Sequence, residues 1–315
     1  MRLSRAFASA VPATREAIQR CVAGYSVEVT PAAAAKVQNF AEVEGLKPGT
    51  TVNVTFLAGA VVDDTVNVCR MLRNAGMNAV AHVPARSFVS LLEVEAYMER
   101  LRHCGVDELL VLGGGAEQPA GSLTDTMQIL ESGLVQKYGF SRIGVAAHPE
   151  GHPDVRSDIM DEAFVRKAEW ATANGVDLYY ETQFCFEPQP LIDWDSHVRG
   201  LLLKRLGRSA PLPPVHLGVA GPAKIVNLIK FAHMSGVGPS MRFVTKFAGN
   251  TLKLATTAAP DELVSALATY QDAESECLFR KLHFYTFGGL KTTLKWANAV
   301  ADGDFELIGS SFRLN

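Results

Sequence analysis

"TVNVTFLAGAVVDDTVNVCRMLRNAGMNAVAHV", Thr51–Val83, reads as a strand, a helix and a second strand in succession. Thr51–Leu57 and Asn78–Val83 are short apolar runs rich in β-branched residues. Between them, Asp63–Met77 carries apolar residues three and four positions apart and a glycine near its end, as an amphipathic helix does. The stretch therefore predicts one βα unit followed by the strand of the next unit.

The same alternation extends in both directions along the chain. Strand-like runs occur at Ser26–Val29, Thr51–Leu57, Asn78–Val83, Glu108–Gly114, Arg142–His148, Leu178–Phe186, Pro214–Gly221 and Lys281–Phe287. The first seven begin about 25 to 36 residues apart, the length of one βα unit, and the longer last interval leaves room for an extra helix near 261–270. Eight such units predict an α/β protein with a (β/α)8 TIM barrel. We expect one domain over residues 1–315, with a helical extension at 1–24.

A doubly wound open sheet is the alternative fold. It usually has five or six strands and a glycine-rich phosphate turn after the first strand. Residues 30–40 follow the first run here and contain no glycine. The number of strand-like runs and the absence of a glycine-rich turn after the first of them both favour the barrel.

Composition excludes several classes of protein. The chain has 48% hydrophobic residues and a formal net charge of -3, without a dense basic run, which argues against nucleic acid or an anionic membrane as partner. Its five cysteines lie far apart and never in CxxC spacing, so neither a disulfide framework nor a thiolate zinc site is indicated. No apolar run suits a secretory signal or a spanning helix. We expect a cytoplasmic protein.

Active sites of (β/α)8 barrels lie at the carboxyl ends of the strands. Those ends offer Glu28, Asp63, Asp64, His82, Gly113–Gly115, His148–His152, Gln183, Gly218 and Gly221. Glu28 interrupts a β-branched strand, and a carboxyl group that points into a barrel mouth has a raised pKa, which suits a proton donor near neutral pH. A structural salt bridge is the other interpretation of this residue.

"HPEGH", His148–His152, could be a metal site, an acid/base pair or a loop that holds a cofactor. A zinc helix needs both histidines on one helical face, and Pro149 and Pro153 disfavour a helix here. The H-x-E of nucleobase deaminases is present, but their P-C-x-x-C is absent. We therefore predict no metal. Phosphate-loop and GxSxG motifs are absent as well.

Four segments in order resemble the methylenetetrahydrofolate reductase family, flavin-dependent (β/α)8 enzymes, over about residues 26–286. They are "SVEVTP" (Ser26–Pro31), "VAAHPEGHPD" (Val145–Asp154), "TQFCFEP" (Thr182–Pro188) and "HFYT" (His283–Thr286). The resemblance implies that Glu28 is the catalytic acid, which protonates the folate so that its five-membered ring opens. It implies that Gln183 binds the pterin, with Phe184 and Phe186 of the same segment at the substrate.

The resemblance also implies a cofactor-binding set. It comprises Phe56, Ala58, Gly59, His82, Gly113, Gly114, Gly115, His148, Glu150 and His152. The chain departs from the family in two of these places. The motif LRGD becomes "LGGG", with Gly113 for arginine and Gly115 for aspartate, and two flavin-loop hydroxyls are replaced at Val61 and Val62. FAD is then held weakly, mainly by backbone groups, or has been lost, and NAD(P)H is the other expected cofactor.

Loss of the LRGD aspartate has a predictable sign if FAD is retained. A carboxylate near the flavin disfavours the negative charge that the ring gains on reduction. At about 4 Å this effect is worth ~1–4 kcal/mol, or ~20–90 mV for two electrons. We therefore expect a bias toward methyltetrahydrofolate oxidation.

The expected function is that of a folate one-carbon oxidoreductase, which interconverts 5,10-methylenetetrahydrofolate and 5-methyltetrahydrofolate by hydride transfer. A tetrahydrofolate derivative is then the substrate, and a homo-oligomer is compatible with the sequence. Two alternatives stay open: a flavin-independent folate/NAD(P)H oxidoreductase of the same fold, and a non-redox folate-binding partner of a methyltransferase. The family's aromatic clamp is expected after Gly221, yet no aromatic residue occurs there before Phe231.

Overall fold

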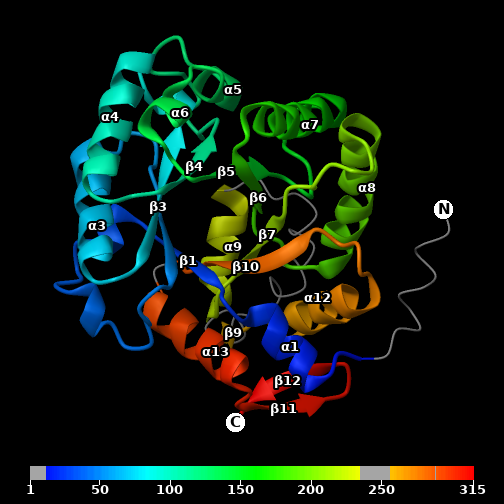
Figure 1. The fold of residues 1–315 in the computed structure, drawn as a ribbon. Coiled ribbons are helices and arrows are strands. Elements are labelled where there is room, and N and C mark those ends of the chain that lie inside the picture. Colours follow the sequence, from blue (N-terminus) through cyan, green and yellow to red (C-terminus); the bar gives the residue numbers. More distant parts are fainter. Residues whose placement is uncertain (1–11, 235–255, 288) are drawn as a thin grey trace. The chain divides into compact units, whose positions relative to one another are not determined.

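Eight parallel strands close into a barrel in the order β1-β10-β7-β6-β5-β4-β3-β2 (Figure 1). The computed structural model describes residues 12–234, 256–287 and 289–315. The barrel strands are β1 (Ser26–Val29), β2 (Thr51–Val54), β3 (Asn78–Pro84), β4 (Glu108–Leu112), β5 (Arg142–Ala147), β6 (Asp177–Thr182), β7 (Val215–Ala220) and β10 (Phe279–Tyr285). The predicted (β/α)8 TIM barrel is confirmed, and the open sheet is excluded.

Helices separate the strands. They are α1 (Arg15–Val22), α2 (Pro31–Ala34), α3 (Val62–Asn74), α4 (Leu91–His103), α5 (Thr126–Leu130), α6 (Leu134–Tyr138), α7 (Ser157–Asn174), α8 (Pro188–Leu206), α9 (Ile225–Met234), α12 (Asp261–Ala273) and α13 (Leu290–Asp302), with short 3-10 turns at Phe40–Glu42 and Ala85–Ser87. Local chemistry sets several of their starts. At α5, for example, Asp125 and Gln128 form a reciprocal capping box.

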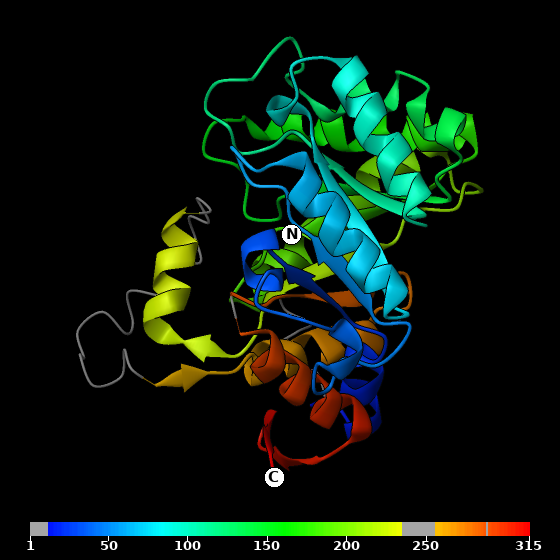
Figure 2. The ribbon, with the colours of Figure 1, turned by 90° about the vertical axis from the view of Figure 1, so that its left-hand side faces the viewer.

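The sequence runs matched strand positions within a few residues, but two parts of the fold were not expected. Between β7 and α12 the chain forms a short antiparallel pair, β8 (Ala223–Lys224) and β9 (Thr257–Ala258), with α9 following β8. Figure 2 shows this pair and α9 to one side of α12 and α13. After α13 the chain ends in an antiparallel hairpin, β11 (Phe305–Ile308) and β12 (Ser311–Leu314). Of the N-terminal extension, residues 1–11 lie outside the described part, and α1 follows.

The chain forms two compact units, which are described separately. The first, called the β1–β6 unit, comprises residues 26–147 and 162–181. Its core includes Phe56 against Phe88 and Tyr97, with ring centroids 5.4 and 5.8 Å apart. On the outer face of β6, Tyr180 stacks on Phe164 of α7 at 3.7 Å and donates a hydrogen bond to its carbonyl oxygen. These contacts hold α4 and α7 against the strands.

The second, called the β7–β10 unit, comprises the described residues of 1–25, 148–161 and 182–315. On the outer face of β10, Phe284 packs edge-on against Tyr25 and Trp296. The fully buried Asp195 of α8 accepts hydrogen bonds from the Tyr270 hydroxyl and the Leu278 backbone N–H, both 2.8 Å long. A buried carboxylate with two donors is satisfied, so Asp195 fastens α8 to α12 and to the start of β10. The buried Asp195 carboxylate therefore has a structural role.

Strand register determines which side chains turn to the barrel interior. Glu28 on β1 is level with Asn53 on β2, Asn53 with Val80 on β3, Val80 with Glu108 on β4, and Glu108 with Arg142 on β5. Side chains alternate along each strand, so residues level with one another share a face. Because the Asn53 side chain contacts Glu181 of β6, this level faces inward.

Within the described residues, no helix is both long and apolar enough to span a bilayer. The same part of the chain contains no cluster of three or more His, Cys, Asp or Glu side chains arranged to hold a metal ion.

Candidate active site

Glu28 lies on β1 and retains only part of its solvent exposure. Burial raises the pKa of its carboxyl group to about 8. A carboxyl group with this pKa keeps its proton near neutral pH and can donate it to a substrate. The structural salt bridge that the sequence also allows for Glu28 stays the alternative interpretation of this residue.

A buried polar pair lies in the same unit. The Asn53 Nδ2 atom donates a hydrogen bond of 2.8 Å to Glu181 Oε1, and the two residues are 1% and 4% exposed. Neither residue was singled out from the sequence. Each lies in a strand in which side chains alternate between the two faces, and this alternation is the sequence pattern that could have indicated an inward polar group.

The loops after β3 and β4 are joined through Arg86. Its backbone N–H donates to Gly113 O at 2.9 Å, its backbone oxygen accepts from Ala120 N at 2.9 Å, and its Nη2 atom donates to Glu117 O at 2.6 Å. A guanidinium group therefore lies beside the loop in which Gly113 replaces the arginine of the LRGD motif. Sequence reasoning missed Arg86, because it lies in a different loop from the residue that it could replace.

Three polar atoms around the end of β3 are buried without a hydrogen-bond partner among the described residues: His82 Nε2, Arg86 Nε and Ser87 Oγ. Burial also lowers the pKa of His82 to about 4, so its ring is neutral at physiological pH. Buried polar atoms without partners are uncommon in folded proteins and often mark a site for a ligand or ion. The end of β3, with His82, and the Gly113–Gly115 loop thus belong to the same unit and are joined through Arg86.

The loop after β2 is less suited to holding a polar cofactor. Phe56 is buried in the cluster with Phe88 and Tyr97, whereas Ala58 and Gly59 are exposed. Leu57 and Val61 are 59% and 56% exposed. This loop offers backbone groups and apolar side chains where the family has hydroxyls.

The histidine loop belongs to the β7–β10 unit. The rings of His148 and His152 meet edge-on with centroids 5.2 Å apart. The loop turns at Gly151, which has a φ of 87° and whose N–H donates to His148 O. The His152 Nδ1 atom accepts a hydrogen bond from Asp154 N at 3.2 Å, which leaves Nε2 as the protonated nitrogen of a neutral ring. Burial is the main cause that raises the pKa of the Cys185 thiol, and the charge of Glu150 is the second cause. The histidine loop therefore lies near Cys185, which follows β6.

At the end of β6, Gln183 is half-buried and its Oε1 atom accepts from the N–H of Phe184 at 3.0 Å. The amide nitrogen of Gln183 is then the group directed away from its own backbone. Phe184 is 1% exposed and contacts Phe186, Tyr285 and Phe287 edge-on, at 5.6, 5.2 and 5.2 Å. Phe184 therefore supports this region as a core residue.

An aromatic surface surrounds Phe184. Phe231 of α9 stacks on Phe287 with ring centroids 4.4 Å apart, and both rings are half-buried. Phe231, in the second turn of α9, thus packs against aromatic residues that follow β6 and β10. Because β8 and the first turn of α9 lie between β7 and Phe231, the sequence did not show this placement.

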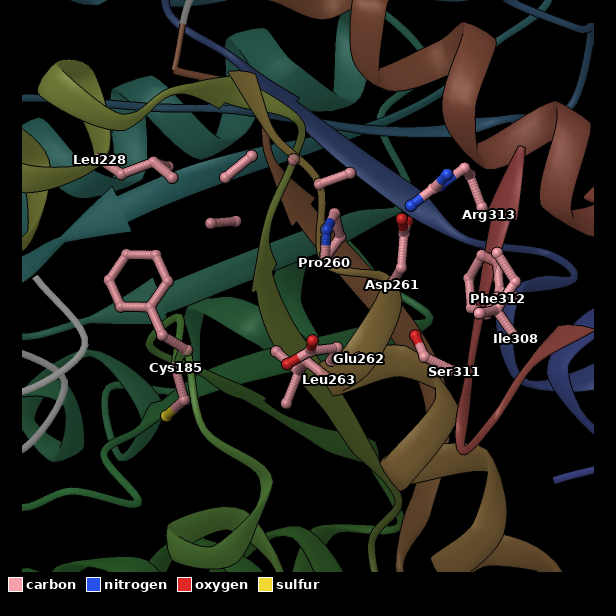
Figure 3. A pocket seen from close by; sticks show the side chains of 15 residues that line it. Cys185, Leu228, Pro260, Asp261, Glu262, Leu263, Ile308, Ser311, Phe312 and Arg313 are labelled. Atoms are coloured by element: carbon pink, nitrogen blue, oxygen red, sulfur yellow. The ribbon is translucent and has the colours of Figure 1, made fainter. Parts of the chain in front are cut away.

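A cavity of about 440 Å³ opens beside these strand ends, entirely within the β7–β10 unit. Phe186, Gly221 and Leu228 contribute to its apolar wall. Its other end is polar, and Figure 3 shows the side chains of Asp261 and Arg313 directed toward each other. Burial raises the pKa of Asp261, although Trp296 Nε1 donates to its Oδ1 atom at 2.8 Å. The cavity suits a largely apolar group of moderate size.

A family profile described as methylenetetrahydrofolate reductase matches residues 14–287 of the chain. The chain belongs to the methylenetetrahydrofolate reductase family. Membership places it among the folate one-carbon oxidoreductases. The match includes Glu28, Gln183 and the His148–His152 loop, and it ends before α13 and the β11–β12 hairpin.

Solved structures of other proteins share a general likeness. A putative phosphonomutase from Burkholderia cenocepacia is 10% identical, with 92% of this chain and 96% of that chain covered and a TM-score of 0.45. A putative deoxyribose-phosphate aldolase from Toxoplasma gondii is 13% identical, with 91% and 98% covered and a TM-score of 0.47. Likeness at this level says nothing about activity.

Proposed function

We propose that this member of the methylenetetrahydrofolate reductase family interconverts 5,10-methylenetetrahydrofolate and 5-methyltetrahydrofolate by hydride transfer. The observation that carries the proposal is Glu28: a barrel carboxyl group whose pKa burial raises to about 8. In the reductive direction Glu28 donates a proton to the folate, which opens the five-membered ring to an iminium. In the oxidative direction the carboxylate takes the proton back.

Substrate binding is assigned to the β7–β10 unit. Gln183 presents its amide nitrogen at the end of β6, where it can donate to a carbonyl oxygen of the pterin. The half-buried Phe231 and Phe287 rings offer a surface on which a planar ring can stack, and Phe186 lines the neighbouring cavity. In this proposal Phe184 holds the surrounding rings in place rather than touching the substrate.

FAD is the proposed redox cofactor, with NAD(P)H as the electron partner; when bound, FAD carries hydride between the nicotinamide and the folate carbon. The buried atoms His82 Nε2, Arg86 Nε and Ser87 Oγ fit a polar ligand at the end of β3. With the backbone of Gly113–Gly115 they would hold the cofactor in the β1–β6 unit. His148, Glu150 and His152 of the β7–β10 unit, and Phe56, Ala58 and Gly59 after β2, stay predicted cofactor-binding residues.

A flavin-independent reaction between NAD(P)H and folate is the second candidate. The exposed apolar side chains of Leu57 and Val61, in the loop that supplies hydroxyls in the family, favour it. The preference for methyltetrahydrofolate oxidation, a homo-oligomeric state and a cytoplasmic location stay predictions. A non-redox folate-binding partner of a methyltransferase is less favoured, because binding alone does not require an acid with a raised pKa such as Glu28.

The deciding experiment is an anaerobic visible spectrum of the full chain mixed with FAD and titrated with 5-methyltetrahydrofolate. Bleaching of protein-bound FAD supports the flavin-dependent reaction. If no FAD binds and NAD(P)⁺ alone is reduced by the folate, the flavin-independent reaction holds. If the folate binds but reduces neither acceptor, the proposed redox function is wrong.

A further inference from the structure

Asn53 is a buried amide with only one of its two polar ends satisfied. Its side chain is 1% exposed, and its Nδ2 atom donates to Glu181 Oε1 at 2.8 Å. Its Oδ1 atom, by contrast, is buried and receives no hydrogen bond from any residue that the structure describes. An acceptor in this position costs stability unless a donor reaches it, so a donor is expected near Asn53 Oδ1.

Register places Glu28 next to Asn53. The two residues are level on adjacent parallel strands, which lie about 4.8 Å apart, and alternation turns both side chains to the interior. A carboxylate has only acceptor oxygens and cannot bond to Asn53 Oδ1, whereas a protonated carboxyl group has an O–H donor. Asn53 Oδ1 and the Glu28 carboxyl group can therefore form a hydrogen bond only when Glu28 carries a proton.

We propose that Asn53 and Glu181 are positioning residues for Glu28: Asn53 Oδ1 accepts the hydrogen bond of the protonated Glu28 carboxyl group, and Glu181 fixes the orientation of the Asn53 amide. The inference rests on the proposed function, in which Glu28 is the acid. It adds two residues that stabilise the protonated Glu28 carboxyl group and hold it in one orientation.

Glu181 is suited to this task because an ionised carboxylate can only accept hydrogen bonds. It selects the NH₂ end of the Asn53 amide, and the oxygen then points the other way. Within the same unit, alternation turns further titratable side chains to the same face of the strands: His82, Glu108, Arg142 and Tyr179.

The proton on Glu28 can be followed without turnover, by infrared spectroscopy of the full chain. The carboxylic acid C=O band that disappears in Glu28→Gln is assigned to Glu28, and its intensity is titrated with pH. We expect Asn53→Leu, which removes the acceptor at similar volume, to lower the titration midpoint by about one pH unit, the size of one hydrogen bond. The C=O band should also move to higher frequency, because the carboxyl group loses its hydrogen bond.

Glu181→Gln keeps the volume and removes the charge, and we expect it to lower the midpoint by a similar amount. If Glu181 acts through Asn53, the double variant shifts the midpoint no further than Asn53→Leu alone. Tyr180→Phe is the matched control, since it removes a buried hydrogen bond from the outer face of the same strand. Its midpoint should equal that of the unaltered protein.

An unchanged midpoint and band in both Asn53→Leu and Glu181→Gln would overturn the inference, as would fully additive shifts in the double variant. Folate turnover is measured separately on the unaltered protein. If the protein turns over no folate but the shifts occur, the proposed function fails and the hydrogen-bonded arrangement stands. If turnover depends on Glu28 but the shifts are absent, the function stands and the positioning role fails.

Discussion

The ring of Phe231 on α9 lies parallel to the ring of Phe287 at the end of β10, with centroids 4.4 Å apart and an angle of 19° between the planes. Phe287 has a φ of 46°, a left-handed backbone conformation that is rare for a bulky residue. Such a conformation persists only where the surroundings hold it, and edge-on contact with Phe184 is part of that support. The stacked pair is therefore a fixed aromatic surface.

Replacing Phe231 by alanine should weaken binding of 5-methyltetrahydrofolate roughly three- to tenfold, the value of one aromatic contact. The dissociation constant is measured by fluorescence titration. Phe231→Leu keeps most of the apolar volume but not the ring, so it should restore the melting temperature without restoring affinity. Equal affinity in all three proteins would remove Phe231 from the substrate site.

Replacing Glu28 by glutamine should reduce folate turnover by ~10²–10⁴-fold, the usual contribution of a general acid. Folate affinity should change little, because glutamine has the same shape and still forms hydrogen bonds. Single-turnover rates and equilibrium dialysis separate the two quantities. Full activity in this variant would show that another group supplies the proton.

The same substitution should change how stability depends on pH. The pKa of Glu28 is near 8 in the folded protein and near 4.5 in the unfolded chain, so between these values the folded state holds the extra proton. The free energy of unfolding therefore falls as pH rises from about 4.5 to about 8, by on the order of a few kcal/mol. Urea unfolding at several pH values should show this fall in the unaltered protein and a smaller fall in Glu28→Gln.

Arg86→Gln should raise the dissociation constant of FAD about tenfold or more, since it removes a charged donor whose Nε atom is buried without a partner in the described part of the chain. Equilibrium dialysis of FAD measures this directly. Arg100→Gln is the control, because Arg100 is exposed and pairs with Asp63. Identical FAD affinity in the two variants would argue against a cofactor contact at Arg86.

Gly144→Ala should destabilise the barrel by ~1–3 kcal/mol, because an added Cβ would lie 2.4 Å from Tyr179 Cζ and 2.8 Å from Leu110 Cδ1. Gly113→Ala meets no atom within 4 Å and should leave stability nearly unchanged. Denaturant midpoints of the two variants test the difference. A neutral Gly144→Ala would mean that the Tyr179 ring moves aside at little cost.

Much of the fold could be predicted from the sequence. Strand-like runs such as Thr51–Leu57 and the intervening amphipathic stretches are local patterns, and eight of them at the spacing of a βα unit leave few architectures. Glu28 was also identifiable, because an acid inside a β-branched strand stands out against alternation. The hairpin of β11 and β12 was missed, since short strands outside the barrel lack a comparable period.

The candidate site could be predicted only in part from the sequence. The hydrogen bond from Asn53 to Glu181 joins residues 128 positions apart, and the stacking of Phe231 on Phe287 depends on where α9 lies after β8. Arg86 reaches Gly113 because two loops meet at adjacent strand ends. The sequence by itself determined the order and type of the elements, since backbone preference and periodicity act over a few residues. Only the tertiary structure decided which polar and aromatic side chains meet, because closing the barrel brings together strands that no local pattern relates.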